Sequence, residues 1–287
     1  MSGIALVTDS TCDLPAAGRL KYGAVVVPLH VSIGDATYVD GIDMNAATFY
    51  KRFAEAGQTA HSSQPSAGEF KQVYADLLES HDSVVSVHIS GRLSGTVGSA
   101  DTAAADVDPG RVRVVDSCRV SVGLGLVVQA TGEAILGGAS LDGVVAAAKA
   151  AARETRVWGV VPSLEVAVHG GRVSARMAHL ADSVELKPII AFGEEGATYV
   201  DGARVGFNRA LRAVAHRVVR FAAGSQVRVS IAHADGPAAA YYLRERLSRS
   251  LARVDIPILE AGAVITTHVG LGTVAVGVQR LVERSSS

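Results

Sequence analysis

The first 160 residues alternate between short apolar runs and segments with a helical pattern. Apolar runs typical of buried strands include Ile4–Val7, Ala24–Pro28, Arg111–Val115 and Val157–Val161. Between the runs lie amphipathic or alanine-rich segments that begin at capping residues, for example the segment that Ser140 opens. This alternation predicts an α/β domain with a parallel, doubly wound sheet.

The pattern changes after Pro162, where a short predicted helix at Leu164–Val168 precedes two strands, 187–192 and 197–200, that pair with each other. A hairpin is predicted around Gly193-Glu194-Glu195-Gly196, which contains typical turn residues. The further predicted elements are helices 208–223 and 237–251 and strands 256–261 and 273–280, together with strand 227–232. We therefore predict two domains, residues 1–160 and residues 161–287, the second an α+β domain with a mixed or antiparallel sheet and any ligand between the two.

The segment Val84–Ala100 predicts an anion-binding mouth. It begins as a buried strand, breaks at Ser90-Gly91 and restarts at Ser94-Gly95-Thr96 as a helix with small, hydroxyl-bearing residues in its first turn. The N–H groups at such a helix start point outward from the edge of the sheet, where open α/β sheets bind anions. A carboxylate or a phosphate would suit this position, although Ser94 could also be a plain helix cap.

A second polar segment precedes the next predicted helix. Ser66 and Glu69 have the spacing of a capping box for a helix that runs to about Ser80. The box gives these two residues a structural role but leaves Ser62, Ser63 and Gln64 without one. We expect these three side chains to be available to a ligand.

Composition narrows the class of protein. The 27 Lys and Arg residues balance 28 Asp and Glu residues, so the basic surface of a general nucleic-acid binder is missing. No apolar run is long enough for a membrane span and no signal sequence is apparent at Met1-Ser2-Gly3, which predicts a soluble, cytoplasmic protein. The chain carries neither a dinucleotide fingerprint nor a phosphate-binding Gly-Lys-Ser/Thr loop, and Cys12 and Cys118 lack metal-site spacing. We therefore expect no metal and no cofactor.

Taken together, the motifs of the chain resemble the DegV family, the fatty-acid-binding subunits of bacterial fatty acid kinase. The resemblance runs from about residue 4 to residue 280, in family order, through Thr8-Asp9-Ser10, Ser62-Ser63-Gln64-Pro65-Ser66, Leu93-Ser94-Gly95-Thr96, Asp116-Ser117, Gly123-Leu124-Gly125, Gly170-Gly171-Arg172, Lys187-Pro188 and His268-x-Gly270-x-Gly272.

The resemblance implies that the protein holds one long-chain fatty acid, such as palmitate, stearate or oleate, in a buried apolar tunnel. A separate ATP-binding kinase subunit would phosphorylate the carboxylate to an acyl phosphate, so this chain itself would be a monomeric, non-catalytic subunit. By resemblance, Ser62 and Ser94 contact the carboxylate, His268 belongs to the head-group end and Arg172 lies at the mouth, facing the kinase.

The residue types fit that chemistry. A buried carboxylate must meet several donors, which the hydroxyls of Ser62 and Ser94 and the N–H groups of Gly95 and Thr96 can supply. Each buried methylene contributes ~0.8 kcal/mol, against ~0.5–1.5 kcal/mol net for a neutral hydrogen bond. Affinity should therefore come from the tunnel, and selection of an acid from the hydroxyl groups.

Two other functions are compatible with the residues. A serine hydrolase could use Ser94, His268 and either Asp9 or Asp116, although the chain has no Gly-x-Ser-x-Gly elbow. A phosphosugar- or dihydroxyacetone-binding module is the third hypothesis, and a tunnel lined by aliphatic side chains would argue against it. Each candidate also has a structural role available, since His268 at an apolar strand end could be a core histidine and Arg172 could cap a helix.

Overall fold

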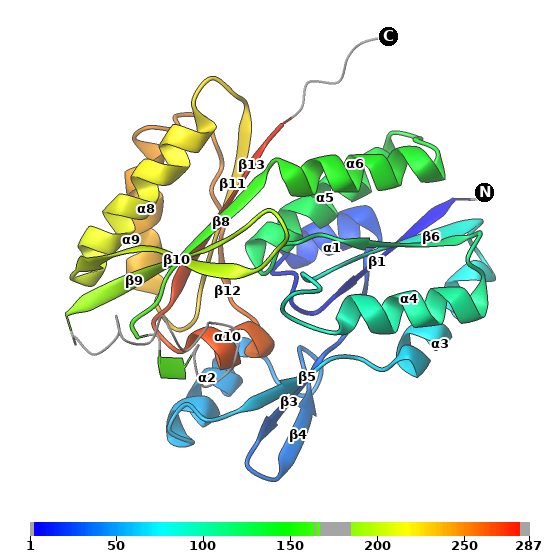
Figure 1. The fold of residues 1–287 in the computed structure, drawn as a ribbon, viewed down its shortest axis with the longest axis horizontal. Coiled ribbons are helices and arrows are strands. Elements are labelled where there is room, and N and C mark those ends of the chain that lie inside the picture. The colour runs from blue at the N-terminus through cyan, green and yellow to red at the C-terminus, as the bar shows by residue number, and fades with distance from the viewer. Residues whose placement is uncertain (1–2, 164, 167–184, 282–287) are drawn as a thin grey trace.

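The computed structural model describes residues 3–163, 165–166 and 185–281, whose strands form three sheets (Figure 1). The first is a parallel sheet of four strands in the order β2-β1-β6-β7. Its strands are β1 (Ile4–Asp9), β2 (Val25–Val27), β6 (Ser83–His88) and β7 (Val112–Asp116). This arrangement confirms the parallel, doubly wound sheet predicted for the N-terminal part of the chain.

Helices cover both faces of the parallel sheet, because successive residues of each buried strand point to opposite faces. On one face lie α3 (Ala67–Leu78) and α4 (Thr96–Val107), and on the other α5 (Val122–Leu136) and α6 (Leu141–Arg153), with α1 (Ala16–Tyr22) against α5. The Ser66–Glu69 capping box at the start of α3 is present as predicted.

The second sheet has six strands in the order β10-β9-β8-β13-β11-β12, with all neighbours antiparallel except β11 and β12. They are β8 (Thr155–Val160), β9 (Leu186–Phe192), β10 (Thr198–Val205), β11 (Val227–His233), β12 (Ile258–Glu260) and β13 (Val274–Arg280). Helices α8 (Phe207–Ala222) and α9 (Pro237–Ser248) pack on one face and α5 on the other.

One strand joins a different sheet from the one we expected. The run Val157–Val161 was predicted to continue the parallel sheet, but β8 pairs antiparallel with β13 and β9. Apolar strands buried on both faces have the same pattern in either sheet, so periodicity could not assign the partner. The six-stranded sheet therefore includes a strand that precedes the predicted domain boundary at residue 160.

A small third sheet lies below the other two in Figure 1, in the order β4-β3-β5. Strands β3 (His30–Ile33) and β4 (Ala36–Val39) form a hairpin that turns at Gly34-Asp35, a typical turn dipeptide, and α2 (Ala46–Glu55) follows. Strand β5 (His61–Ser63) was not predicted. It pairs antiparallel with β3, with Ser62 opposite Val31, so its backbone has a structural role.

Helix α10 (Ala263–Val269) was not predicted either, and His268 lies in its last turn rather than at a strand end. Two carboxylates from the N-terminal part of the chain hold the start of this helix. The N–H of Gly262 donates to Asp13 Oδ1 at 3.1 Å, and the N–H of Ala263 donates to Asp40 Oδ1 at 3.3 Å. Burial raises the pKa of Asp13 to about 7 and that of Asp40 to about 6.

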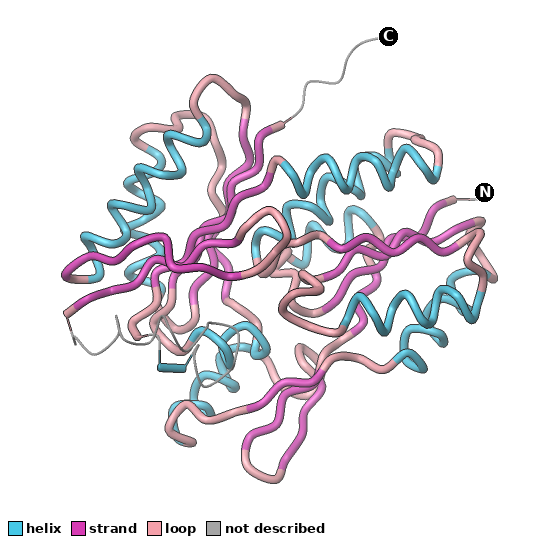
Figure 2. Tube along the Cα trace, in the orientation of Figure 1, coloured by secondary structure: helices cyan, strands magenta, loops and turns pink. Residues whose placement is uncertain are grey.

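The turn between β9 and β10 fastens the six-stranded sheet to the loops of the parallel sheet (Figure 2). The side chain of Arg119, only 2% exposed, donates from Nη1 to the carbonyl of Gly193 at 3.0 Å and from Nε to that of Thr155 at 2.9 Å. Ser90 Oγ donates to the carbonyl of Gly196 at 3.0 Å. These bonds fix the two larger sheets relative to each other and define the space between them.

Candidate ligand-binding site

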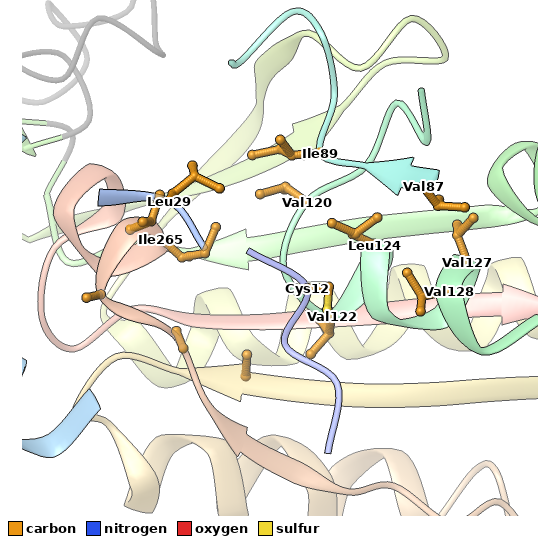
Figure 3. Packing of buried hydrophobic residues seen from close by; sticks show 14 of the residues in the cluster. Cys12, Leu29, Val87, Ile89, Val120, Val122, Leu124, Val127, Val128 and Ile265 are labelled. Carbon is orange, nitrogen blue, oxygen red and sulfur yellow. The ribbon is translucent and has the colours of Figure 1, made fainter. Parts of the chain in front are cut away.

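A cavity of about 1070 Å³, including the part open to solvent, lies where the three sheets and α10 meet. Most of its lining is aliphatic. The apolar lining residues are Leu29, Ile89, Leu93, Val120, Val157, Gly159, Val161, Ile190, Phe192, Ala232, Ala234, Ala261, Val264, Ile265, Val269 and Ala275. Figure 3 shows Leu29 and Ile265 side by side, with Ile89 and Val120 nearby, in the core that continues into the parallel sheet.

Four polar side chains form one part of the lining, which we call the polar wall: Ser62, Gln64, Ser94 and His268. Ser62 Oγ lies 2.7 Å from His268 Nε2, which joins β5 to α10. The side-chain amide of Gln64 lies directly against Gly95, so closely that a Cβ on that glycine would be 2.4 Å from Gln64 Nε2. The polar wall therefore runs from β5 across to the start of α4.

Ser94 and its neighbours differ in their access to the cavity. Ser94 lines it, and its Oγ lies 2.8 Å from Thr96 Oγ1 and accepts a hydrogen bond from the N–H of Thr96 at 3.3 Å. Thr96 itself is fully buried, and neither it nor Gly95 belongs to the lining. Of the residues predicted to bind the carboxylate, the structure thus brings Ser62, Ser94 and His268 to one cavity and sets Gly95 and Thr96 beside it.

Arg172 lies outside the described residues, as do His169-Gly170-Gly171 and most of the helix predicted at Leu164–Val168. Of the three side chains that we expected to be available to a ligand, Ser62 and Gln64 lie in the polar wall, whereas Ser63 is exposed and does not line the cavity.

Other polar residues of the lining are already satisfied within the protein. Ser121 Oγ donates to Asp13 Oδ2 at 2.5 Å, and Thr273 Oγ1 donates to the carbonyl of Val269 at 2.8 Å. His233 accepts a hydrogen bond from the N–H of Gly236 at 3.4 Å, and burial lowers the pKa of its imidazole, which favours the neutral form. The capacity to bind a polar group is therefore concentrated at the polar wall.

Among the described residues, the lining contains no Lys or Arg. An anionic head group would therefore meet hydroxyls, the Gln64 amide and the His268 imidazole rather than a fixed positive charge. Such a wall suits a carboxylate at the end of an apolar molecule. The aliphatic remainder argues against the phosphosugar module, whose ligand would leave most of its hydroxyls unpaired.

The two carboxylates that a hydrolase would need are occupied in their own loops. Asp9 accepts hydrogen bonds from the N–H groups of Thr11 at 3.0 Å and Ile89 at 2.9 Å. Asp116 accepts hydrogen bonds from the N–H groups of Gly91 at 3.1 Å and Cys118 at 2.7 Å. Both carboxylates cap their own loops, so neither is available to orient His268 in a catalytic triad.

A second serine–histidine pair lies in the N-terminal core, and the sequence reasoning missed it. His88 Nε2 is 2.6 Å from Ser86 Oγ, and its Nδ1 is 3.0 Å from Asp9 Oδ2. Tyr74 donates to Ser86 Oγ at 2.8 Å. All four side chains are fully buried, so this Asp9–His88–Ser86–Tyr74 chain, which we call the sealed network, is structural despite its triad-like order.

No three His, Cys, Asp or Glu side chains of the described residues gather closely enough to hold a metal ion. None of the helices in this part of the chain is both long and apolar enough to span a lipid bilayer.

Comparison with known proteins identifies the family. The family model described as an uncharacterised protein of the DegV family matches residues 3–281. A DegV domain-containing protein of Deinococcus radiodurans is 36% identical over 282 residues, which cover 97% of this chain and 99% of that protein. A DegV domain-containing protein of Mycobacterium bovis is 32% identical over 274 residues, covering 95% and 96% of the two chains.

Solved structures agree with the family match. A DegV family protein from Thermus thermophilus, named for its fatty acid binding, superposes with a TM-score of 0.91 at 35% identity, covering 97% of this chain and all of that one. DegV from Bacillus subtilis, named as a fatty acid binding protein, has a TM-score of 0.88 at 27% identity, covering 98% and 100%. The matches extend over nearly the whole length of these proteins, and the chain belongs to the DegV family.

Proposed function

We propose that this protein binds one long-chain fatty acid in the cavity, with its carboxylate at the polar wall, and presents it to a separate ATP-binding kinase subunit. The observation that carries the proposal is a single cavity that combines the Ser62–His268 pair and Ser94 with an otherwise aliphatic lining. The fatty acid binding named for the Thermus thermophilus and Bacillus subtilis relatives supports it.

The hydrocarbon tail supplies most of the affinity. A chain of about fourteen methylenes that leaves water gains ~11 kcal/mol before the cost of association. The lining that would receive it includes large aliphatic and aromatic side chains of the six-stranded sheet, such as Ile190 and Phe192. Their size sets how far the tail reaches, and therefore the preferred chain length.

The polar wall selects the acid. The carboxylate oxygens accept hydrogen bonds from Ser62 and Ser94, with His268 close by to donate from its imidazole when protonated. An ester or alcohol of the same length would fill the cavity but form weaker bonds with these donors. Arg172, together with the backbone N–H groups of Gly95 and Thr96, completes the proposed head-group region.

Phosphorylation of the bound acid requires the partner. An oxygen of the carboxylate attacks the γ-phosphorus of ATP, the bond to the β-phosphate oxygen breaks, and ADP leaves. The chain contains no nucleotide-binding motif, so ATP belongs to the kinase subunit. The role of this protein is to hold the carboxylate at the mouth of the cavity while its tail stays buried.

Native mass spectrometry tests the binding step directly. Protein purified from a bacterial host without detergent is expected to carry one fatty-acid mass per chain, and delipidated protein is expected to take up palmitate or oleate in a 1:1 ratio. Delipidated, folded protein that takes up neither acid would contradict the proposal. The methyl ester of the same acid serves as the control for head-group selection.

The kinase step is tested separately. Fatty-acid-loaded protein is mixed with ATP and an ATP-binding kinase subunit, and acyl phosphate is trapped with hydroxylamine as a hydroxamate. Hydroxamate that depends on both proteins and on ATP supports presentation to a kinase. Fatty acid that remains unmodified, although the kinase subunit phosphorylates the acid bound to another DegV protein, counts against it.

A further inference from the structure

A second cavity, of about 760 Å³ including its open side, lies beside α5 and shares no lining residue with the ligand cavity. Its walls are the loop after β1, one face of α5, strand β11 and the loop that precedes β12. The fatty-acid proposal gives this cavity no role.

A buried hydroxyl faces this second cavity. Ser230 is only 6% exposed and lines the cavity from β11. Within the described residues, its Oγ has no hydrogen-bond partner in the protein. A hydroxyl withdrawn from bulk water without a partner costs roughly 1–3 kcal/mol, so this position favours a bound polar group.

Arg228 contributes a second unfilled donor on the same face of the strand, two residues earlier. Its Nη2 donates to Glu133 Oε2 at 2.5 Å, which fixes the guanidinium in place. Its Nη1 is buried and has no partner among the described residues. The donor left over therefore has a defined position beside Ser230.

Arg253 adds a second positive charge at the exposed side of the cavity. It lines the cavity, and its side chain makes no hydrogen bond or ion pair within the part of the chain that the structure describes. Glu133 forms an ion pair with Arg228, whereas none of the acidic residues that the structure describes forms an ion pair with Arg253.

Two carboxylates, those of Asp13 and Asp255, also line the cavity, and a negative charge on either would repel an anion. Both oxygens of Asp13 already accept hydrogen bonds, from the N–H of Gly262 and the hydroxyl of Ser121. Burial raises the pKa of Asp13 to about 7, so it carries only part of a negative charge at neutral pH. Asp255 is exposed, where water screens its charge.

We propose that the second cavity is a binding site for a small oxyanion, either a carboxylate or a phosphate, whose oxygens accept hydrogen bonds from Arg228 Nη1, Ser230 Oγ and Arg253. Planar guanidinium groups match the spacing of such oxygens, and a neighbouring hydroxyl completes the donor set. The site does not depend on the fatty-acid proposal, because it lies in a separate cavity and uses different residues.

The test titrates the full chain with sodium phosphate and, separately, with sodium acetate, each against sodium chloride at equal ionic strength. Thermal unfolding and isothermal calorimetry report binding. One of the two oxyanions is expected to raise the unfolding temperature saturably beyond the chloride control, and the stronger one identifies the class of ligand. No saturable effect of either anion overturns the proposal.

Variants locate the response. Arg253→Gln is expected to weaken binding of the effective anion about tenfold, and Ser230→Ala about threefold. Neither substitution breaks an existing ion pair, so both variants should fold. Arg249→Gln is the matched control, because Arg249 is an exposed arginine four residues away that does not line the cavity. Equal binding by all three variants and the parent chain means an adventitious ion only and overturns the assignment.

Discussion

Two of the serine–histidine pairs among the described residues have nearly the same length but very different surroundings. Ser86 and His88 lie 2.6 Å apart in the sealed network, where Tyr74 and Asp9 complete the bonding and no solvent enters. Ser62 and His268 lie 2.7 Å apart on the wall of a cavity lined by aliphatic side chains. Residue type and distance therefore do not distinguish the two pairs, whereas the cavity beside Ser62 and His268 does, and it is the reason that we propose a binding role for this pair alone.

The largest expected effect comes from breaking the sealed network. His88→Ala removes the link between Ser86 and Asp9 and leaves a void and a buried carboxylate with fewer bonds. We expect a loss of ~3–5 kcal/mol in the free energy of unfolding, measured by urea denaturation. The folded fraction should bind fatty acid with an affinity within about twofold of the parent, a difference in binding free energy of ~0.4 kcal/mol or less.

His61→Ala is the matched control for that variant, because His61 is an exposed histidine on β5 and should change stability by less than ~0.5 kcal/mol. A His88→Ala protein with parental stability but poor ligand binding would reverse the roles that we assign to the two pairs.

The next effect concerns the pair on the cavity wall. Ser62→Ala removes one hydroxyl from the polar wall and is expected to weaken fatty-acid binding about tenfold, equivalent to ~1.4 kcal/mol, with little change in stability. Ser63→Ala removes the same atom from the adjacent residue of β5, which is exposed and does not line the cavity. Affinities measured by fluorescent fatty-acid displacement should separate the two variants, and equal affinities would remove Ser62 from the site.

A smaller effect is expected where Gln64 covers Gly95. In Gly95→Ala the new Cβ would lie 2.4–2.7 Å from the amide atoms of Gln64, which must move away from the polar wall. Because that amide ends a flexible, exposed side chain, stability should hardly change while affinity falls by about threefold, ~0.7 kcal/mol. Gly98→Ala, in the same helix with open space around it, should leave affinity unchanged and stabilise the protein by ~0.4–1 kcal/mol.

The dependence of stability on pH tests how α10, and with it His268, is held. Asp13 has a raised pKa when folded, so the native state keeps a proton that the unfolded chain releases between about pH 4 and pH 7. Its contribution to stability therefore declines as pH rises through that window. Asp13→Asn keeps an acceptor for the N–H of Gly262 and removes the titrating carboxyl group that causes the decline. The unfolding temperature of the variant minus that of the parent should therefore increase from pH 4 to pH 8.

Asp35→Asn, at the exposed β3–β4 turn, is the control and should track the parent at every pH. Asp40 contributes in the same direction as Asp13, so the double variant with Asp40→Asn should have the flattest profile. This account would be contradicted if the stability of the parent rose between pH 4 and pH 7 and the stability of every variant rose by the same amount.

Local signals in the sequence were enough to predict much of the fold. The capping box at Ser66 and Glu69, the turn at Gly34-Asp35 and the helix start after Ser94 all appear where their chemistry indicates. These features depend on neighbours within a few residues, which a single sequence displays. The glycine at position 123 of α5 permits close packing on β8, because a Cβ there would be 2.3 Å from Val157 Cγ2.

The sequence could not predict contacts between distant segments. The segment 263–269 is rich in β-branched residues that favour strands, and it becomes a helix where Asp13 and Asp40 meet its first N–H groups. Likewise, β5 is short and polar, and only the adjacent β3 makes it a strand. The Ser62–His268 contact joins residues 206 positions apart, so the resemblance to relatives, rather than any periodicity, brought them together in advance.

The position of β13 has a consequence for how the protein is made. It is the last of the described strands along the chain, yet it lies inside the six-stranded sheet, between β8 and β11. A nascent polypeptide therefore cannot join those two strands until residues 274–280 have left the ribosome exit tunnel. The cavity takes part of its lining from β8, β9, β11 and β13, so its walls are complete only from that moment on.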